Sequence, residues 1–404
     1  MEPLIIEGAR VLLPGAEASV SVRIEDGVVT GLDVARDGAR VIDAHGMILA
    51  PAMVDIHGDA FERQLMPRPG VDFPLEAALL ETDRQLAANG IATAYHALTL
   101  SWEPGLRSVA KGQAVVDALT ALAPRLTVDN RVQLRWETFC FEALPLIDQA
   151  LASPRKPSIA FNDHTSMAVL DPSTPLQERP FDHDPAFPVT DMTSPVFATT
   201  MAERAKRSGL THPAYVALIQ SMWQRRPDVP AVMDQVAAKG RAAGVPMLSH
   251  DDSQIETRRF YRDLGARISE FPMNARTAEA ARLAGDWIIF GAPNAARGGS
   301  HLGSPGAADM LKRGLCDILA SDYFYPAMLT AVARLIADGH ALHDLWKLVS
   351  TNPARASGLS DRGEIAPGQR ADLTLIDWPE GGTPAPRLTL VAGRTAYNAQ
   401  PFQR

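Results

Sequence analysis

The sequence predicts an α/β protein: a (β/α)8 TIM barrel with a small β-sandwich domain formed by both termini. Two observations predict this fold. The middle of the chain alternates short apolar runs with Ala- and Leu-rich helical stretches, which is typical of βαβ units with parallel strands. Both ends instead carry short strand-like runs separated by Gly and Pro. We therefore divide the chain into a sandwich domain of residues 1–51 and 352–404 and a barrel domain of residues 52–351.

The terminal strands are predicted from four apolar runs. Two lie at residues 4–13 and 19–30, and Glu25-Asp26-Gly27 gives a hairpin signal within the second. Two more lie at residues 371–377 and 388–394. Two unrelated terminal hairpins would also explain these runs, but one sandwich built from both ends is the more specific prediction.

The barrel is predicted from eight candidate strands. They are residues 52–56, 91–97, 132–136, 158–161, 245–249, 267–270, 287–290 and 317–321. Eight parallel strands with helices between them close into a barrel. The span from His164 to Val245 is long and rich in proline, so we interpret about 170–235 as an insertion after the fourth strand, which could act as a lid.

Composition excludes several classes of protein. Hydrophobic residues make up 46% of the 404 residues and charged residues 21%, which is typical of a folded protein without a membrane span. The net charge of -8 argues against nucleic acid as a partner. Two cysteines make no disulfide framework, and the N-terminus does not read as a signal peptide, so we expect a cytoplasmic protein. Whether the chain forms a homo-oligomer is left open by the sequence.

Polar residues end several of the candidate strands. Active sites of such barrels lie at the C-terminal ends of the strands, and these side chains should therefore meet. The candidate metal ligands are His57, Asp59, Glu137, His164, His250 and Asp322. Imidazole and carboxylate suit a divalent metal, one or two ions, with Zn expected first and Mn or Fe as alternatives.

We expect the six ligands to divide between two ions. His57, Asp59 and Asp322 would hold one, His164 and His250 the other, and Glu137 would lie between them. Two such ions can activate water, and Asp322 is the candidate catalytic residue that accepts its proton. A single strand-end histidine is more often a structural hydrogen-bonding group; the prediction depends on three histidines and three carboxylates occurring together.

Other residues near the strand ends are candidates for binding substrate. After the seventh strand, glycines and an arginine could hold an anion through backbone N–H groups and the guanidinium, although a flexible Gly-rich loop is the alternative. Arg63 and Arg68 follow the first strand, where Arg68 could equally belong to a surface turn. Glu270 could orient a substrate or His250, or cap a helix. The full set is Arg63, Arg68, His96, Glu270, Arg297, Gly298, Gly299, Ser300 and His301.

Two longer motifs resemble the amidohydrolase superfamily. Residues 41–59, which end in Asp55-Ile56-His57-Gly58-Asp59, resemble the entry into its barrel, and residues 351–373 resemble the exit into its β-sandwich. Within the superfamily, segments such as Pro67-Arg68-Pro69-Gly70 and Arg297-Gly298-Gly299 resemble the α-D-ribose 1-methylphosphonate 5-triphosphate diphosphatases of the carbon–phosphorus lyase pathway. Gly58, His96 and residues 166–169 depart from that pattern.

The resemblance implies a metal-dependent hydrolase of phosphonate metabolism. Metal-activated water would cleave a phosphoanhydride bond of a ribose 5-triphosphate and release pyrophosphate, with Arg68, Arg297 and the Gly298–Gly299 backbone holding the polyphosphate of this small, phosphorylated substrate. The departures leave open an amidohydrolase acting on a C–N or C–O bond, as in a cyclic amide, a lactone or a deamination. A scaffold without activity is a third possibility, which the presence of all six candidate ligands disfavours.

Overall fold

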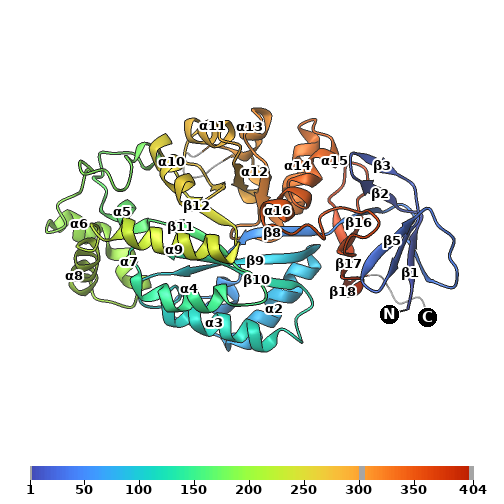
Figure 1. Cartoon of the computed structure of the whole chain (residues 1–404), viewed down its shortest axis with the longest axis horizontal. Coiled ribbons are helices and arrows are strands. Elements are labelled where there is room, and N and C mark those ends of the chain that lie inside the picture. Colours follow the sequence, from blue (N-terminus) through green and yellow to red (C-terminus); the bar gives the residue numbers. More distant parts are fainter. Residues whose placement is uncertain (1, 300–304, 400–404) are drawn as a thin grey trace.

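Eight parallel strands surround a common axis in the computed structural model, which describes residues 2–299 and 305–399 (Figure 1). The hydrogen-bonded order follows the chain from β8 to β15, and a bridge between Gly58 and Asp322 joins the first strand to the last. The strands are β8 (Met53–Gly58), β9 (Ile91–Leu100), β10 (Asp129–Glu137), β11 (Ser158–Asn162), β12 (Met247–His250), β13 (Ile268–Glu270), β14 (Trp287–Gly291) and β15 (Ile318–Ala320). The predicted barrel is confirmed, since each of the eight expected segments forms one of these strands.

Helices lie between the strands and around them (Figure 1). Successive barrel strands are connected through helices, as expected for βαβ units. The α-helices are α1 (Glu62–Leu65), α2 (Leu75–Ala88), α3 (Val109–Leu122), α4 (Leu144–Leu151), α5 (His164–Val169), α6 (Pro195–Thr200), α7 (Ala202–Arg207), α8 (His212–Trp223), α9 (Val229–Ala243), α10 (Ile255–Leu264), α11 (Ala275–Leu283), α12 (Ala292–Arg297), α13 (Ala307–Lys312), α14 (Ala327–Ala337), α15 (Leu342–Lys347) and α16 (Thr351–Ala356). Short 3-10 helices are η1 (Phe141–Ala143) and η2 (Leu176–Glu178).

Strands from both ends of the chain share one sheet. Its order is β18-β17-β16-β7-β2-β3, so that β7 from the N-terminal part pairs with β16 from the C-terminal part. A second sheet has the order β5-β4-β1-β6. These strands lie together at the right of Figure 1. Their bounds are β1 (Leu4–Glu7), β2 (Arg10–Leu13), β3 (Ala16–Ala18), β4 (Val22–Glu25), β5 (Val28–Leu32), β6 (Arg40–Asp43), β7 (Ile48–Pro51), β16 (Leu373–Asp377), β17 (Ala385–Val391) and β18 (Arg394–Asn398).

Side chains alternate between the barrel interior and its outer surface, as the strand geometry requires. Val54, Tyr95 and Leu248 belong to an apolar cluster contributed by several barrel strands. Leu98 and Leu134 instead pack with residues of the surrounding helices. The barrel interior is therefore filled, and only the strand ends are available for a site.

The long connection between β11 and α9 contains α5, η2, α6, α7 and α8. Arg179 of this segment is buried and pairs with Asp182 at 2.7 Å. Its Nη2 also donates to the backbone oxygen of Asp251 at 3.0 Å, just beyond the end of β12. The connection therefore reaches the end of the barrel at which the strands terminate.

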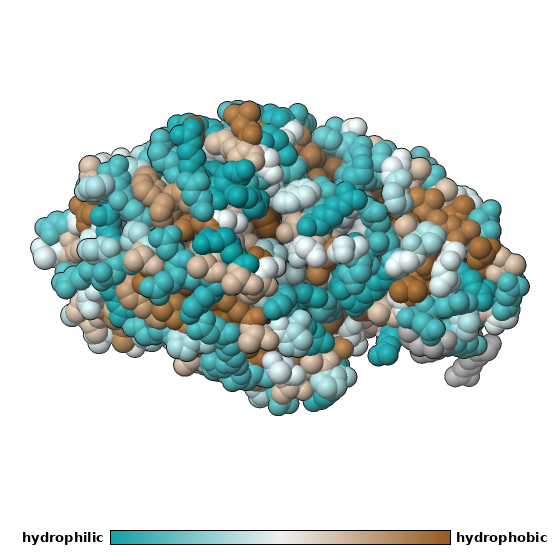
Figure 2. All heavy atoms as spheres, in the orientation of Figure 1, coloured by the Kyte–Doolittle hydropathy of each residue, from teal (hydrophilic) through white to brown (hydrophobic). Residues whose placement is uncertain are grey.

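No helix among the described residues is long and apolar enough to cross a membrane. The face of the molecule in Figure 2 mixes hydrophilic residues with small hydrophobic patches, one of which lies over the terminal strands.

Asp129, the first residue of β10, joins the barrel to the C-terminal part of the chain. Arg362 Nη1 lies 2.8 Å from its carboxylate, and Arg131 contacts it at 3.0 Å. Burial by itself raises the pKa of Asp129, but Arg131 and Arg362 outweigh burial and hold the pKa below its usual value. The ionised carboxylate is therefore favoured in the folded protein.

Replacing Asp129 with Asn is expected to destabilise the protein by about 3 kcal/mol near neutral pH, because the buried Arg362 and the partly buried Arg131 lose the carboxylate that they share. The pKa of Asp129 is lower in the folded than in the unfolded protein, where it is about 3.9. Its ionisation therefore stabilises the folded protein fully at a pH above about 3.9, and this stabilisation is lost as the pH falls through the folded pKa. The melting temperatures of Asp129→Asn and the wild type should therefore converge on acidification. A constant difference from pH 7 to pH 3 would contradict this role.

Candidate metal centre

The ends of β8, β11, β12 and β15 bring their polar side chains together. His57, Asp59 and Asp322 each offer a ligand atom within 4.8 Å of the others. His164 and His250 form a second such group, whose third member is Asp251. These two groups divide the residues as predicted for two ions, except that Asp251 stands in place of Glu137. A third group, His57, His250 and Glu270, links them, and the assignment of ligands to ions stays a prediction.

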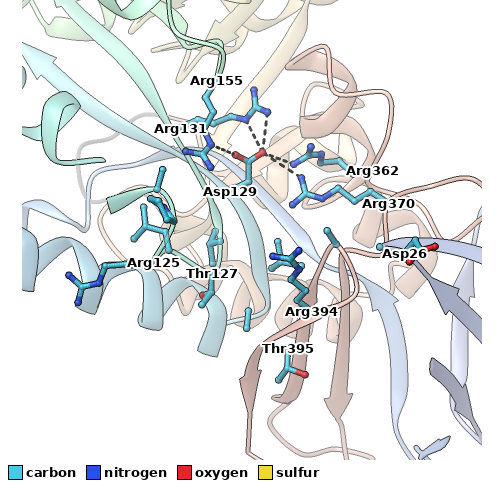
Figure 3. A pocket seen from close by; sticks show the side chains of 18 residues that line it. Asp26, Arg125, Thr127, Asp129, Arg131, Arg155, Arg362, Arg370, Arg394 and Thr395 are labelled. Atoms are coloured by element: carbon cyan, nitrogen blue, oxygen red, sulfur yellow. Dashed lines mark hydrogen bonds and ion pairs between the residues drawn. The ribbon is translucent and has the colours of Figure 1, made fainter. Parts of the chain in front are cut away.

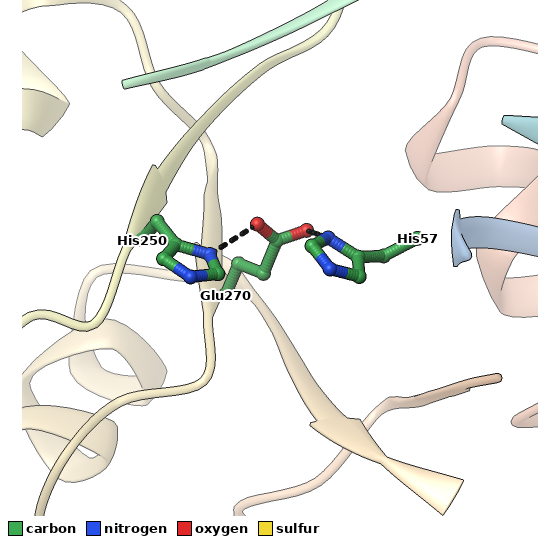
Figure 4. Close-up of side chains that lie close together, drawn as sticks. All are labelled: His57, His250 and Glu270. Atoms are coloured by element: carbon green, nitrogen blue, oxygen red, sulfur yellow. Dashed lines mark hydrogen bonds and ion pairs between the residues drawn. The ribbon is translucent and has the colours of Figure 1, made fainter. Parts of the chain in front are cut away.

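Glu270, the last residue of β13, lies between two histidines (Figure 4). Its Oε2 accepts a hydrogen bond from His250 Nδ1 at 2.7 Å, and its Oε1 lies 2.9 Å from His57 Nδ1. Gln133 Nε2 also donates to Oε1 at 2.8 Å. The carboxylate is fully buried, and burial raises its pKa, but His57 and His250 outweigh burial and hold the pKa well below its usual value.

The position of Glu270 corrects its predicted role as a substrate-binding residue. Its two oxygen atoms are engaged by histidine rings and Gln133, and its side chain is 0% exposed, so a substrate has no access to it. It instead fixes the orientation of His57 and His250 through their Nδ1 atoms, whereas His250 Nε2 lies 3.3 Å from Arg135 Nη2. Orienting His250 was one of the alternatives that the sequence left open.

Glu137, the last residue of β10, serves His164. Its Oε1 accepts from His164 Nδ1 at 2.5 Å, and its Oε2 accepts from the His164 backbone N–H at 3.1 Å. Burial raises the pKa of Glu137, but His164 outweighs burial and lowers the pKa to about 2. Both oxygens of Glu137 face His164, and its predicted position between two ions stays a prediction.

Asp322 follows β15 and is held by the first strand of the barrel. Its backbone N–H donates to the His57 oxygen at 2.9 Å, and its oxygen accepts from the Asp59 N–H at 2.9 Å. These bonds place its side chain beside His57 and Asp59. Burial raises the pKa of Asp322 to about 6, with Asp59 adding to the rise and His57 opposing it.

Three residues just beyond the strands have left-handed backbone. They are Asp251 (φ 57°), Phe271 (φ 54°) and Asp322 (φ 55°), which follow β12, β13 and β15. This conformation is unfavourable for residues other than glycine, above all for a bulky one such as Phe, and such strain gathers at functional sites. The Phe271 ring packs edge-on against His57 at 4.9 Å and His250 at 5.5 Å between ring centroids.

Two arginines and one carboxylate of this site were missed by the sequence reasoning. Arg135 of β10 is 7% exposed; its Nη1 lies 3.5 Å from Asp59 Oδ2 and its Nη2 lies 3.3 Å from His250 Nε2. Arg107 Nη2 lies 3.8 Å from the same Asp59 oxygen and pairs with Glu62 at 2.8 Å. Arg135 could have been found, because it shares the inward face of β10 with Gln133 and Glu137, at spacings of two residues. Asp251 directly follows His250 and carried no separate signal.

His96 lies outside the site, which corrects the prediction that it contacts substrate. Its Nε2 lies 2.7 Å from Asn130 Oδ1, and its ring packs edge-on against Phe61. It alternates with Tyr95, which faces the barrel interior, so His96 points outward. Burial lowers the pKa of His96, and this histidine is therefore a buried structural residue.

The glycines after β14 are not anion donors, contrary to the prediction. Both Gly298 N–H and Gly299 N–H donate to the Asn294 oxygen at 3.1 Å. Gly298 has a φ of 84° and ends α12, which requires the left-handed conformation that glycine adopts readily. Ser300 and His301 lie outside the described residues.

The remaining substrate candidates are exposed arginines. Arg63 lies over the ring of Tyr323, the residue after Asp322, with 5.7 Å between its guanidinium carbon and the ring centroid. Arg68 is exposed in the turn that pairs it with Val71, and Arg297 is exposed at the end of α12. None of the three lies in either group of candidate ligands.

The donor set fits a divalent metal ion. Each of the two groups combines imidazole nitrogen with carboxylate oxygen, which is typical of Zn, Mn and Fe sites. Each of the three histidines also has a carboxylate on its Nδ1, an arrangement that fixes ligand histidines in metalloproteins. These residues therefore form a candidate site for a divalent metal.

The amidohydrolase family profile matches residues 186–397, which is just over half of the chain. The chain belongs to the amidohydrolase family. An alpha-D-ribose 1-methylphosphonate 5-triphosphate diphosphatase of Escherichia coli (strain K12) is 29% identical over 380 residues, which cover 92% of this chain and 94% of that protein. The protein is a hydrolase of this family.

Two further comparisons find a short similar segment in one protein and a similar fold in another. An adenine deaminase of Brucella suis biovar 1 (strain 1330) is 41% identical over 68 residues, which cover 17% of this chain and 11% of that protein. The solved structure of molinate hydrolase superposes with a TM-score of 0.61 at 15% identity and covers 98% of this chain and 94% of its own. This last likeness supports the barrel with its terminal sheets.

Proposed function

We propose that this amidohydrolase family member is a metal-dependent hydrolase that cleaves a phosphoanhydride bond of a ribose 5-triphosphate and releases pyrophosphate. The observation that carries the proposal is the arginine within the candidate metal centre. Arg135 contacts both Asp59 and His250, and Arg107 adjoins Asp59. Permanent cations beside the reacting centre suit a polyphosphate, whose oxygens they can neutralise. The similarity to a diphosphatase along nearly the whole chain agrees with this reading.

A divalent metal, Zn first and Mn or Fe otherwise, would be held by His57, Asp59 and Asp322, with His164, His250 and Asp251 as a second position. When bound, it would supply activation of water and polarisation of the bond under attack. We assign this chemistry to the metal and the remaining steps to the side chains around it.

The side chains have separate tasks in this mechanism. Asp322 accepts the proton of the attacking water, as a carboxylate in contact with the centre can. Arg135 donates to oxygens of the substrate phosphate, while Glu270 and Glu137 hold the histidines in place. Arg63, Arg68 and Arg297 are exposed cations that would contact the more distant phosphates.

A second candidate is hydrolysis of a C–N bond in a small molecule. The short segment that is 41% identical to an adenine deaminase favours it. A neutral C–N substrate carries no phosphate group for Arg68 or Arg297 to bind. These arginines therefore discriminate between the two candidates.

The direct test measures pyrophosphate release from a ribose 5-triphosphate by the metal-loaded protein, in the wild type and in Arg68→Ala and Arg297→Ala. The proposal expects release that a chelator abolishes and that each substitution lowers strongly. Full activity in both variants would remove these arginines from the polyphosphate site. Bound metal without pyrophosphate release, together with turnover of an amide or an aminopurine, would favour the second candidate.

Arg135→Ala is expected to lower kcat/KM for a ribose 5-triphosphate about 100-fold, the usual loss on removal of one buried donor to a developing oxyanion. Arg135→Lys should retain part of the activity, because it keeps the charge and loses the planar pair of donors. Steady-state kinetics measure both effects, and Arg84→Ala, an exposed arginine of α2, is the matched control. A wild-type kcat/KM in Arg135→Ala would contradict the assignment.

A further inference from the structure

A cavity of about 720 Å³ lies between the barrel and the C-terminal sheet, and arginines line it (Figure 3). Asp129, the first residue of β10, stands near its centre, whereas the candidate metal centre lies at the other end of the same strand, beyond Glu137. The cavity is therefore distinct from the metal centre. Its arginines are Arg125, Arg131, Arg155, Arg362, Arg370 and Arg394.

Four of these guanidinium groups converge on a single carboxylate (Figure 3). The distances to Asp129 are 3.0 Å from Arg131, 3.5 Å from Arg155, 2.8 Å from Arg362 and 3.6 Å from Arg370. One carboxylate satisfies at most two guanidinium groups with bidentate geometry. The contacts of Arg155 and Arg370 with Asp129 are the longest of the four, and both residues line the cavity.

Nearby acids do not neutralise the remaining charge. Asp361 pairs with Arg362 at 2.8 Å, and Asp372 pairs with Arg370 at 3.0 Å. With Asp26 and Asp129 in the lining, the described residues place four acids against six arginines. The cavity is therefore positive, although the whole chain has a net charge of -8.

Two of the six arginines form no ion pair within the part of the chain that the structure describes. Arg125 follows α3 and is exposed; Arg394 begins β18 and is also exposed. Arg394 approaches the Asp129 group from the C-terminal sheet in Figure 3, without a bond to it. A cleft lined by charges of one sign raises the local concentration of ions of the opposite sign, here anions.

We propose that this cavity binds a multivalent phosphate anion, such as pyrophosphate or a small molecule that carries a diphosphate. Arginine forks match phosphate oxygens in pairs, and several converging forks favour phosphate over a single carboxylate. Arg155 comes from the barrel, whereas Arg370 and Arg394 come from the C-terminal part of the chain. The bound anion therefore ties the two parts together and stabilises the folded protein.

The test titrates inorganic pyrophosphate into the metal-loaded protein and follows heat of binding and melting temperature. The proposal expects saturable binding at this cavity and a rise in melting temperature of about 2–5 °C. Arg394→Glu should weaken this binding at least 10-fold and leave hydrolytic activity unchanged. This variant therefore distinguishes pyrophosphate bound in the cavity from pyrophosphate bound at the metal centre. Arg40→Glu, which changes an exposed arginine of β6 outside the cavity, should bind like the wild type.

Two further arms separate the phosphate site from a structural ion-pair network. Asp129→Asn removes the internal anion and should bind pyrophosphate more tightly wherever its melting curve still shows a folded protein. Citrate, a polycarboxylate, should bind at least 10-fold more weakly than pyrophosphate. Identical titrations in the wild type and Arg394→Glu, or citrate binding as tight as that of pyrophosphate, would overturn the proposal.

Discussion

Asp322→Asn is expected to lower kcat for the hydrolytic reaction by about 1000-fold, because the variant loses both a proposed metal ligand and the proposed proton acceptor. Asp322 belongs to the ligand group with His57 and Asp59, and it is the proposed proton acceptor. Its backbone is held by hydrogen bonds to His57 and Asp59, so the amide of the variant occupies the same position. The loss therefore reports chemistry rather than displacement.

The measurement is steady-state kcat at saturating substrate, with and without excess divalent metal. A loss of metal binding alone would be restored by excess metal, whereas a loss of the proton acceptor would persist. Asp338→Asn, which changes an exposed aspartate after α14, is the matched control and should retain wild-type kcat. A kcat within 10-fold of the wild type in Asp322→Asn would remove this residue from the mechanism.

Glu270→Gln is expected to weaken metal binding by about 10–100-fold, the usual effect of changing a carboxylate that orients a ligand histidine. Glu270 serves two histidines, through 2.7 Å to His250 and 2.9 Å to His57. A glutamine of the same shape offers one oxygen and one NH2 group. One of the two rings must then lose its acceptor and change its tautomer.

Competition with a chelator of known affinity measures this effect directly, and activity at excess metal should partly recover. Glu279→Gln, on the exposed surface of α11, supplies the same change of charge without contact to the site. If Glu270→Gln and Glu279→Gln release metal at the same chelator concentration, the orienting role is wrong. Recovery at excess metal distinguishes Glu270→Gln from Asp322→Asn.

The barrel could be predicted from the sequence because its strands are short, apolar and separated by helical stretches. Each of the eight segments was located within a few residues; β9 and β10 extend further than expected because their ends pair with each other over residues 93–100 and 129–136. The candidate ligands His57, Asp59, His164, His250 and Asp322 also followed from position, since a polar residue that ends a parallel strand lies at one end of the barrel.

The predictions that failed concerned residues whose role depends on partners distant in the sequence. Glu270 looked like a substrate contact because its partner His57 is far along the chain and only the closed barrel brings them together. Gly298 and Gly299 looked like anion donors because the sequence does not reveal that Asn294 already accepts from both N–H groups. His96 was predicted to contact substrate because one residue of register decides whether a strand residue faces inward or outward, and the sequence did not reveal this register.

Local periodicity, together with the end at which parallel strands terminate, was enough to predict the barrel, the terminal sheets and the chemical types of group at the strand ends. The pairing of each histidine with its carboxylate, the place of Arg135 beside Asp59 and His250, and the cavity with six arginines could be seen only in the folded chain. These arrangements depend on distances of a few ångströms between segments far apart in the chain. Local sequence carries no record of such distances.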